Sequence, residues 1–479
     1  MENRSSLIKD LESLLGQERV VSHPTELLVY ECDGLTLSKH GADAVVLPET
    51  TEEVSEIVQC CQRHETPFLA RGSGTGLSGG AVAAEGGIII QMSRMANILE
   101  IDYNDEVAVV QPGVINLHLS DATRPEGYHY APDPASQKAC TIGGNVAENA
   151  GGPHTLKYGV TTNHVLGLTA VMPDGEIVKF GGRFESTSGY DLVGLFVGSE
   201  GTLGIVTEVI VKLIKNPESY KTFLASFDTV EAASNSVSSI IAAGIIPAAL
   251  ELIDALVIEA VESHLKAGFP QDVAAILLIE IDGLASTLST QAGEIRNICR
   301  NHGATDFQQA RSEQERAQLW RGRKEAIGAL GKVTPAFYTN DGVVPRSRLP
   351  EILEFDIEAG KRNGLRVAHL CHAGDGNIHP IILYNHEDDT ETKAAMETSR
   401  EILQRCIDLG GALTGEHGIG TEKLTSFSVM FGESDEAQML AVRSALNPSG
   451  KLNPGKIFPT GARCGESKIR QTVAGGGWL

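Results

Sequence analysis

Residues 67–82 read Pro-Phe-Leu-Ala-Arg-Gly-Ser-Gly-Thr-Gly-Leu-Ser-Gly-Gly-Ala-Val. Five of the nine residues at 72–80 are glycine, and Arg71 precedes them. Glycine has no Cβ, so the backbone N–H groups of such a segment can bend around an anion. We therefore predict a phosphate-binding loop. A glycine-rich turn without a ligand is the alternative, because a single glycine motif is weak evidence for a ligand.

Residues 74–79 match the G-x-G-x-x-G pattern of dinucleotide-binding Rossmann domains. That pattern requires a helix after the turn, so that the pyrophosphate lies at a helix N-terminus. Here residues 80–87 include three further glycines, and the following Ile88-Ile89-Ile90 is typical of a buried strand. We therefore reject a Rossmann domain and expect a loop between strands that holds a diphosphate through its backbone.

The composition limits the kinds of partner. A chain of 479 residues is too long for one hydrophobic core and predicts two or three domains. The net charge is −23 and no Lys/Arg cluster is present, so nucleic acid is not an expected ligand. Residues 1–15 lack the features of a signal peptide, and no apolar run approaches the roughly 20 residues that span a bilayer, so we expect a cytoplasmic protein. The eight cysteines form no iron–sulfur pattern.

Two more glycine-rich segments follow, at residues 132–159 and 198–206. Between them, Asp174-Gly175 is flanked by apolar runs and predicts a β-hairpin. Three glycine-rich segments bordered by strands favour an extended nucleotide cofactor. From about Pro217, predicted strands at 221–227 and 274–281 alternate with predicted helices at 230–243, 254–265 and 287–301, which indicates a second α+β domain.

The second domain contains a pattern typical of metal sites. Residues 370–380 read Leu-Cys-His-Ala-Gly-Asp-Gly-Asn-Ile-His-Pro, and we predict a hairpin that turns on Asp375-Gly376. In that register His372 and His379 are directly opposite each other on one face, close enough to share one ion. A purely structural histidine pair is the alternative.

The third candidate ligand is Glu416, which precedes His417 in a loop bounded by glycines. Two histidines and one glutamate make a divalent site with open positions, and Zn²⁺, Mn²⁺ or Fe²⁺ would fit. His417 is then left for other chemistry. A solvated loop without a metal is the alternative.

Together these residues resemble the FAD-linked oxidases of the vanillyl-alcohol oxidase type over residues 44–459, in particular the branch of glycolate oxidase, D-lactate dehydrogenase and D-2-hydroxyglutarate dehydrogenase. The resemblance implies an α+β fold with a bipartite FAD-binding domain, a substrate (cap) domain with an antiparallel sheet, and a C-terminus that returns to the FAD domain. We expect an N-terminal helical segment at 1–40, the FAD-binding domain at 41–216, the substrate domain with the metal site at 217–430, a returning segment at 431–460 and a flexible tail at 461–479.

The resemblance also implies functional residues. It assigns FAD contacts to Arg71, Gly72, Ser73, Gly74, Thr75, Gly76 and Ser78 in the first segment, to Pro132, Thr141, Ile142, Gly143, Gly144, Gly152, Tyr158 and Gly159 in the second, to Glu200, Gly201, Gly204 and Ile205 in the third, and to Asn453. It assigns His372, His379 and Glu416 as metal ligands, His417 as the general base, and Arg323 as the residue that binds the substrate carboxylate. Family members with covalent flavin have a histidine where this chain has Thr75, so we expect dissociable FAD.

The hypothesis is an FAD-dependent 2-hydroxy acid dehydrogenase. A metal would bind the carboxylate and hydroxyl of a 2-hydroxy acid, His417 would take the hydroxyl proton, and hydride would pass to flavin N5. Members of the family that take dicarboxylates have a basic residue where this chain has Thr339, which favours glycolate or D-lactate over D-2-hydroxyglutarate.

The electrons must leave to an external acceptor. The resemblance implies either a second flavin subunit with an iron–sulfur subunit, as for glycolate oxidase, or a quinone or cytochrome, as for D-lactate dehydrogenase. Peripheral association with a membrane stays open. Two other hypotheses are a metal-dependent hydrolase that uses the same His, His and Glu, and a flavoprotein subunit that only relays electrons.

Overall fold

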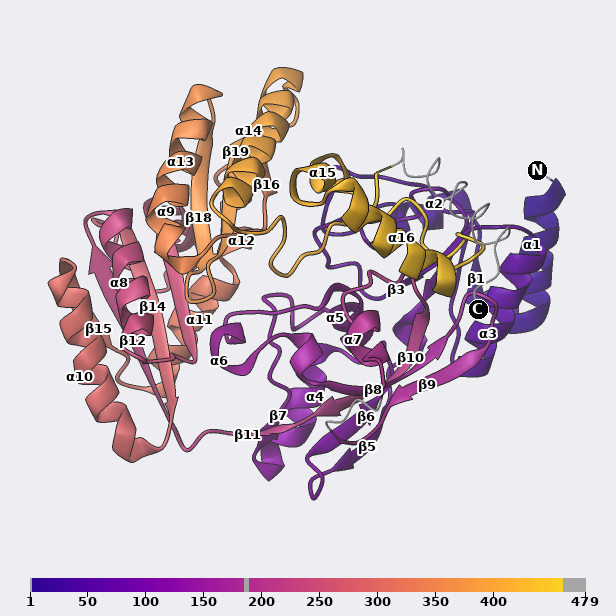
Figure 1. Cartoon of the computed structure of the whole chain (residues 1–479), viewed down its shortest axis with the longest axis horizontal. Coiled ribbons are helices and arrows are strands. Elements are labelled where there is room, and N and C mark those ends of the chain that lie inside the picture. The colour runs from indigo at the N-terminus through magenta and orange to yellow at the C-terminus, as the bar shows by residue number, and fades with distance from the viewer. Residues whose placement is uncertain (1, 185–188, 460–479) are drawn as a thin grey trace. The chain divides into compact units, whose positions relative to one another are not determined.

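The computed structural model describes residues 2–184 and 189–459, and the chain divides into two compact units (Figure 1). Unit 1 takes its residues from 1–150, 160–215 and the segment from 416 onward, and unit 2 comprises 151–159 and 216–415. The segment 416–430, which the sequence analysis assigned to the substrate domain, groups with unit 1, and 151–159 groups with unit 2. The tail predicted at 461–479 lies outside the described residues.

Unit 1 contains two main sheets. The first has the order β1-β2-β4-β3, and β4 runs parallel to both β2 and β3. Its strands are β1 (Val20–Val21), β2 (Ala44–Val46), β3 (Phe68–Arg71) and β4 (Ile88–Gln91). Helices α1 (Glu2–Leu15) and α3 (Thr51–Arg63) pack on this sheet through a core that includes Leu7, Leu11 and Ile57.

The second sheet of unit 1 is antiparallel, with the order β5-β6-β10-β8-β9. Its strands are β5 (Ile98–Asp102), β6 (Val107–Val110), β8 (Val165–Val171), β9 (Ile177–Gly181) and β10 (Ile205–Lys212). The predicted hairpin is confirmed: β8 and β9 are adjacent, and Gly175 in their turn has a φ of 91°. Around this sheet lie the short pair β7 (Tyr128–His129) and β11 (Ile214–Lys215) and the helices α4 (Asn116–Thr123), α5 (Ile142–Glu148) and α7 (Leu192–Phe196).

The glycine-rich loop joins β3 to β4 without a helix. The two strands are direct parallel neighbours, so the loop replaces the helix that a Rossmann crossover would contain. The rejection of a Rossmann domain is therefore confirmed.

The C-terminal segment returns to unit 1, as predicted. The backbone N–H groups of Thr421 and Glu422 donate to the carbonyl of Ser78 inside the glycine-rich loop, at 2.9 and 3.1 Å. Farther along, the N–H of Asn453 donates to the carbonyl of Phe68, at 2.8 Å. This segment carries α15 (Phe427–Met430) and α16 (Glu433–Leu446). Contacts between residues far apart in the sequence therefore hold the loop in its conformation.

Unit 2 is built on one eight-stranded sheet of order β15-β12-β14-β13-β18-β19-β16, with β17 paired to β19. Its strands are β12 (Ser219–Phe227), β13 (Ala249–Asp254), β14 (Ala275–Gly283), β15 (Ala304–Gln309), β16 (Ala336–Thr339), β17 (Gly342–Val343), β18 (Arg366–His372) and β19 (Asn377–Tyr384). The recorded pairs are all antiparallel.

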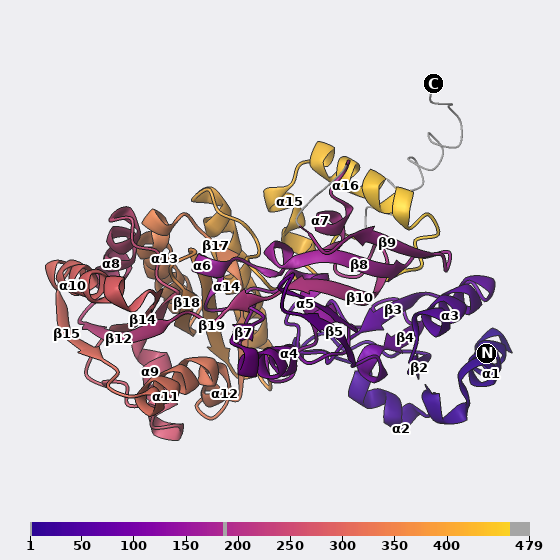
Figure 2. The ribbon, with the colours of Figure 1, turned by 90° about the horizontal axis from the view of Figure 1, so that it is seen from below.

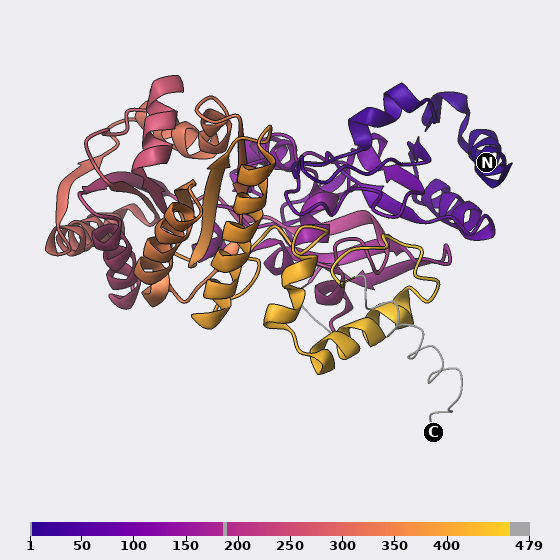
Figure 3. The ribbon, with the colours of Figure 1, turned by 90° about the horizontal axis from the view of Figure 1, so that it is seen from above.

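Helices cover both faces of this sheet (Figures 2 and 3). One face carries α8 (Val230–Ala242), α10 (Ala285–Asn301), α13 (Leu349–Arg362) and α14 (Asp389–Asp408). The other carries α9 (Ala255–His264), α11 (Glu313–Lys324) and α12 (Ala326–Leu330). Because both faces are covered, strands such as β13 and β19 are buried at every position, and the polar side chains on them lie inside the unit. No helix in the described part of the chain combines the length and the apolar character needed to cross a bilayer.

Candidate functional site

A pocket in unit 1 lies where the three glycine-rich segments meet. It is lined by Ala70, Arg71, Gly72, Gly80, Ala81, Met92, Pro112, Thr141, Gly143, Gly144, Val146, Ala147, Glu148, Phe196, Ser199, Glu200, Gly201, Gly204, Ile205 and Val206. The lining therefore combines glycines and alanines, whose backbones are accessible, with one arginine and two glutamates.

The wall of the pocket contains some of the residues that were predicted to bind the cofactor. Those in its wall are Arg71, Gly72, Thr141, Gly143, Gly144, Glu200, Gly201, Gly204 and Ile205. Ser73, Gly74, Thr75, Gly76, Ser78, Pro132, Ile142 and Asn453 belong to unit 1 but lie outside the lining, and Gly152, Tyr158 and Gly159 belong to unit 2. The side-chain amide of Asn453 donates to the carbonyls of Gly80 and Glu200, at 3.2 and 2.7 Å, so it ties two pocket walls together.

Arg71 forms hydrogen bonds that stabilise the glycine-rich loop. Its Nη1 donates to the carbonyl of Ala81 at 2.9 Å, and its Nη2 donates to the carbonyl of Cys32 at 2.8 Å. Gly74, with a φ of 67°, passes so close that a Cβ there would lie 2.2 Å from Arg71 Nη2. A side chain at position 74 would therefore displace the Arg71 guanidinium at a backbone conformation that favours glycine.

The start of α5 forms the second wall. Thr141 is its N-cap, and Thr141 Oγ1 accepts from the N–H of Gly144 at 3.2 Å. A Cβ on Gly72 would lie 2.4 Å from that same Oγ1, and a Cβ on Gly143 would lie 2.5 Å from the Cβ of Pro112. The absence of side chains at these glycines lets the two walls approach each other.

Glu148 and Glu200 place two carboxyl groups beside this pocket. Glu200 accepts from the N–H groups of Ile419 and Gly420, at 2.7 and 2.8 Å, which fixes the C-terminal segment to the pocket wall. A Cβ on Gly418 would lie 2.5 Å from Glu148 Oε2 and 2.9 Å from Glu200 Oε1, so both carboxyl groups face the same glycine.

Glu148 differs from Glu200 because no backbone N–H among the described residues is recorded as donating to it. Its Oε2 is inaccessible to solvent and has no hydrogen-bond partner among the described residues. Burial, and next the neighbouring Glu200, raise the pKa of Glu148 well above its usual range, so we treat Glu148 as a neutral acid. Glu148 was not predicted from the sequence, although its position among small residues of the second glycine-rich segment is a signal for it.

The predicted histidine pair lies on one hairpin of unit 2, but the predicted register is wrong. His372 pairs with Asn377, and His379 pairs with Leu370, across a four-residue loop at 373–376. The predicted two-residue turn does not form because the N–H of Gly374 donates to the carbonyl of Leu250, at 3.1 Å. The two histidines are therefore diagonal neighbours.

The pair nevertheless shares one face of the sheet. Because the register differs by two residues, side-chain alternation still places both histidines on the same face. Their ring centroids are 5.2 Å apart, with an interplanar angle of 87°. Both side chains are buried.

Each histidine has an oxygen atom beside its Nδ1. His372 Nδ1 lies 2.9 Å from Glu251 Oε1, and His379 Nδ1 lies 3.4 Å from the carbonyl oxygen of Asn340. Metal-bound histidines typically donate one ring N–H to a carboxylate or carbonyl and bind the ion through the other nitrogen. The donor set of this hairpin therefore fits a divalent metal through the two Nε2 atoms.

Arg323 lies beside His372. It is 2% exposed, its Nε donates to Glu251 Oε2 at 2.6 Å, and its Nη2 lies 3.4 Å from His372 Nδ1. Glu251 thus contacts the guanidinium and the imidazole at once. Burial acts to raise the pKa of Glu251, but the Arg323 guanidinium and the hydrogen bonds with His372 and Arg323 outweigh burial and lower it. Glu251 Oε2 contacts both Nε and Nη2 of Arg323, which fixes the orientation of the guanidinium.

A second buried carboxylate lies on the neighbouring strand of the sheet in unit 2, where Glu280 of β14 pairs with Ala249 of β13. Glu280 accepts from Arg316 Nη2 at 2.7 Å and from Trp320 Nε1 at 2.7 Å. Two residues along β14, Asp282 accepts from the hydroxyl of Tyr158 at 2.5 Å. Burial, and then the hydrogen bond to Asp282, raise the pKa of Tyr158, so this residue remains a neutral phenol.

Glu416 and His417 belong to unit 1, whereas His372, His379 and Arg323 belong to unit 2. The ligand set predicted from sequence therefore draws on both units. Within unit 1, Glu416 and His417 directly precede Gly418, which faces Glu148 and Glu200.

This fold and these sites define a flavin-linked oxidoreductase. A model of the FAD binding domain matches residues 42–181, and a model of the C-terminal domain of FAD linked oxidases matches residues 216–457. The chain belongs to the FAD-linked oxidase family. This membership supports an oxidoreductase rather than a metal-dependent hydrolase.

Individual relatives show which members of the FAD-linked oxidase family this chain is similar to. The chain is 44% identical to glycolate oxidase subunit GlcD of Escherichia coli (strain K12), over 97% of this chain and 93% of that protein. It is 41% identical to glycolate oxidase subunit GlcD of Bacillus subtilis (strain 168), over 95% and 98%. It is 32% identical to the probable mitochondrial D-lactate dehydrogenase of Danio rerio, over 87% and 84%.

Solved structures show the same fold at low identity. p-Cresol methylhydroxylase superposes with a TM-score of 0.80 at 17% identity, over 95% of this chain and 97% of that one. 4-Ethylphenol oxidase from Gulosibacter chungangensis superposes with a TM-score of 0.77 at 20% identity, over 96% and 98%. The chain therefore has the two-domain FAD-binding fold of the vanillyl-alcohol oxidase type.

Proposed function

We propose that this protein oxidises a small 2-hydroxy acid, glycolate or D-lactate, to the 2-oxo acid. The names of its relatives, glycolate oxidase subunit and D-lactate dehydrogenase, support this substrate class. The observation that carries the proposal is the contact of Glu251 with both Arg323 and His372. Glu251 holds the Arg323 guanidinium beside His372, which is a candidate metal ligand. This arrangement suits a 2-hydroxy acid, because the carboxylate that the guanidinium would bind and the hydroxyl that the metal would bind are on adjacent carbons.

The pocket of unit 1 fits FAD. Its walls are glycine backbones that approach closely, and Glu148 offers a buried acid group with an unsatisfied oxygen, which a polar cofactor would satisfy. When bound, FAD accepts the hydride from the substrate. Arg71, Gly72, Thr141, Gly144, Glu200 and Gly201 would hold it, together with the remaining residues assigned from the family. Thr75 offers no imidazole for a covalent bond, so we propose dissociable FAD.

His372, His379 and Glu416 would hold a divalent metal such as Zn²⁺, Mn²⁺ or Fe²⁺. When bound, this ion lowers the pKa of the substrate hydroxyl. Glu251 and the carbonyl of Asn340 orient the two imidazoles by their contacts to Nδ1.

His417 would take the proton from the substrate hydroxyl. An imidazole has an ordinary pKa near 6.5, so it is a competent base at neutral pH. Gly418, with a φ of 89°, follows it directly and helps to set the path of the loop.

Arg323 would bind the substrate carboxylate. Its Nε–Nη2 edge is engaged by Glu251, so the guanidinium plane is fixed before substrate arrives. Fixed geometry of this kind lowers the entropy cost of aligning the substrate.

Thr339 favours a short substrate. It ends β16, and its Oγ1 is buried without a hydrogen-bond partner in the described chain. A threonine cannot neutralise a second carboxylate, whereas a lysine at this position could. We therefore propose glycolate or D-lactate in preference to D-2-hydroxyglutarate.

The electrons would pass to an external acceptor. Two of the relatives are named as subunits of glycolate oxidase, which supports a partner chain as that acceptor. A second flavin subunit with an iron–sulfur subunit is our first choice, and a quinone, cytochrome or oxygen is the alternative.

Anaerobic mixing of the flavin-loaded protein with each acid tests the proposal. We expect glycolate or D-lactate to bleach the flavin absorbance, and a chelator to abolish the bleaching. His417→Asn should lower the bleaching rate by about 10²–10⁴-fold, the usual contribution of a general base. His386→Asn, at an exposed position of unit 2, is the matched control and should bleach like the parent.

Two results would contradict the proposal. Flavin that stays oxidised with every acid would argue for a subunit that only relays electrons. Bleaching that is unaffected by the chelator and by His417→Asn would remove the metal and the base from the reaction.

A further inference from the structure

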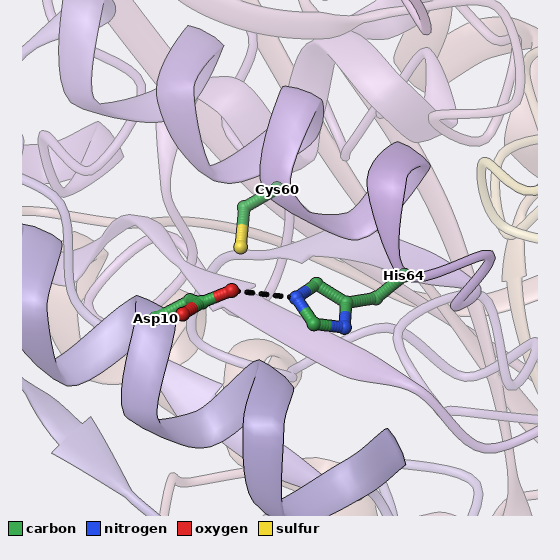
Figure 4. A group of neighbouring side chains, drawn as sticks. All are labelled: Asp10, Cys60 and His64. Atoms are coloured by element: carbon green, nitrogen blue, oxygen red, sulfur yellow. Dashed lines mark hydrogen bonds and ion pairs between the residues drawn. The ribbon is translucent and has the colours of Figure 1, made fainter.

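Helices α1 and α3 of unit 1 bring together three side chains of the types that bind metals, in residues that the flavin site does not use. Asp10 comes from α1, Cys60 from α3, and His64 is the C-cap residue of α3 (Figure 4). Each offers one ligand atom, and these atoms all lie within 4.8 Å of one another. Figure 4 shows the carboxylate and the imidazole directed toward each other, with the thiol beside them.

The local structure explains why these residues meet. Cys60 and His64 are four residues apart, so they lie on the same side of the helix end. Leu7 and Leu11 of α1 pack into the core that contains Val54, Ile57 and Cys60 of α3, which holds the two helices against each other. The position of Asp10 on α1 then places its carboxylate over the end of α3, where His64 Nε2 lies 2.7 Å from Asp10 Oδ2.

We propose that Asp10, Cys60 and His64 form a second divalent metal site, which binds Zn²⁺ with one thiolate, one imidazole, one carboxylate and a water molecule. Thiolate, imidazole and carboxylate are the protein ligands of zinc, and three protein ligands with one water complete its preferred tetrahedron. Magnesium and calcium prefer oxygen ligands and are disfavoured by the thiol.

The site has a buried side and an open side. Cys60 is 1% exposed, whereas the side chain of His64 is 13% exposed and that of Asp10 is 51% exposed. An ion can therefore enter past Asp10 and bring its water ligand from that side. Ligand atoms around a tetrahedral zinc lie roughly 3.3–3.8 Å apart, so Asp10 Oδ2 and His64 Nε2, now 2.7 Å apart, must separate when the ion binds. The exposed carboxylate of Asp10 can make this movement.

Zinc binding would release the proton of the Cys60 thiol. A cysteine must lose its thiol proton to bind zinc. Zinc forms the Zn–S bond as the S–H bond breaks, and the proton leaves to solvent. The ion would also replace the direct hydrogen bond between Asp10 and His64, and it would link α1 to α3.

The site can be tested separately from the flavin chemistry because its thiolate distinguishes it from a His, His and Glu site. The full-length, flavin-loaded protein is reduced, stripped of metal with a chelator, loaded with zinc chloride and passed over a desalting column. Zinc K-edge X-ray absorption is then recorded. We expect a sulfur shell at about 2.3 Å, together with nitrogen and oxygen ligands at about 2.0–2.2 Å.

Three variants complete the test. Cys60→Ser should remove the sulfur shell, and His64→Gln, which keeps the thiol and changes a partly exposed position, should weaken zinc binding on the order of tenfold or more. Cys32→Ser is the matched control at a partly exposed cysteine outside the cluster, and it should leave the sulfur shell unchanged. Absence of sulfur scattering in the parent protein, or its persistence in Cys60→Ser, would overturn the proposal. Neither result depends on hydroxy acid oxidation.

Discussion

Raising the pH from about 6 to about 10 should destabilise unit 2 by about 3 kcal/mol, and His369 should be the main cause. This residue is fully buried on β18, on the same strand as the candidate metal ligand His372 but without a role in the site. Its Nδ1 lies 3.1 Å from Asp254 Oδ2, and its Nε2 lies 3.3 Å from Asp356 Oδ2. A positive imidazole is thus held between two carboxyl groups.

The magnitude follows from the pKa of His369. Burial acts to lower this pKa, but the two aspartates outweigh burial and raise it from 6.5 to about 9. A rise of about 2.5 pH units, at about 1.4 kcal/mol for each, corresponds to about 3 kcal/mol. Because the folded pKa is the higher one, the stabilisation is complete below about pH 6.5 and is lost as the pH rises through about 9.

Denaturant unfolding at a series of pH values measures this effect. Trp320 lies in unit 2, and Trp478→Phe would leave it as the only tryptophan of the chain, so its fluorescence would report on unit 2. His369→Asn should unfold more easily at pH 6 and should show little change in unfolding free energy between pH 6 and 10. His386→Asn, at an exposed position, should retain the pH dependence. The reasoning is refuted if His369→Asn loses stability with rising pH as steeply as the parent.

Three further predictions concern the Glu251–Arg323 ion pair, the cofactor pocket and the glycine-rich loop. Glu251→Gln leaves the buried guanidinium of Arg323 without its carboxylate and should lower the unfolding free energy of unit 2 by about 3–5 kcal/mol in the same assay; an unchanged midpoint would count against this ion pair. Glu148→Gln keeps a neutral hydrogen-bonding group in the pocket and should preserve the visible flavin spectrum, whereas Glu148→Ala should shift it; identical spectra for both variants would place Glu148 outside the cofactor environment. Gly79→Ala introduces a Cβ 2.1 Å from Thr421 Oγ1 at a φ of 74° and should lower the thermal midpoint of unit 1, while Gly41→Ala, where a Cβ would meet nothing within 4 Å, should not; equal midpoints would refute the tight packing of the loop.

Local sequence rules correctly predicted the loop between β3 and β4 and the β8–β9 hairpin. The absence of a helix after the glycine-rich loop followed from the density of glycine at 80–87, and the β8–β9 hairpin followed from Asp174-Gly175. These features depend on backbone conformations of a few adjacent residues, which sequence specifies directly.

The histidine hairpin shows where such rules fail. Asp375-Gly376 indicated a turn correctly, but a distant carbonyl, that of Leu250, captures the N–H of Gly374 and lengthens the loop. The common face of His372 and His379 was still predicted, because side-chain alternation is unchanged by a shift of two residues. The partners of their Nδ1 atoms could not be predicted, since Glu251 and Asn340 lie 121 and 39 residues away along the chain.

Residue types and short spacings were enough to predict the class of protein, the glycine-rich segments and the candidate ligands. The lining of the pocket, the burial of Glu148 beside Glu200, and the contacts of Glu251 with Arg323 and His372 became visible only in the folded chain. So did the meeting of Asp10 with Cys60 and His64. The reason is physical: these contacts join residues far apart in sequence, and their geometry is set by how whole sheets and helices pack.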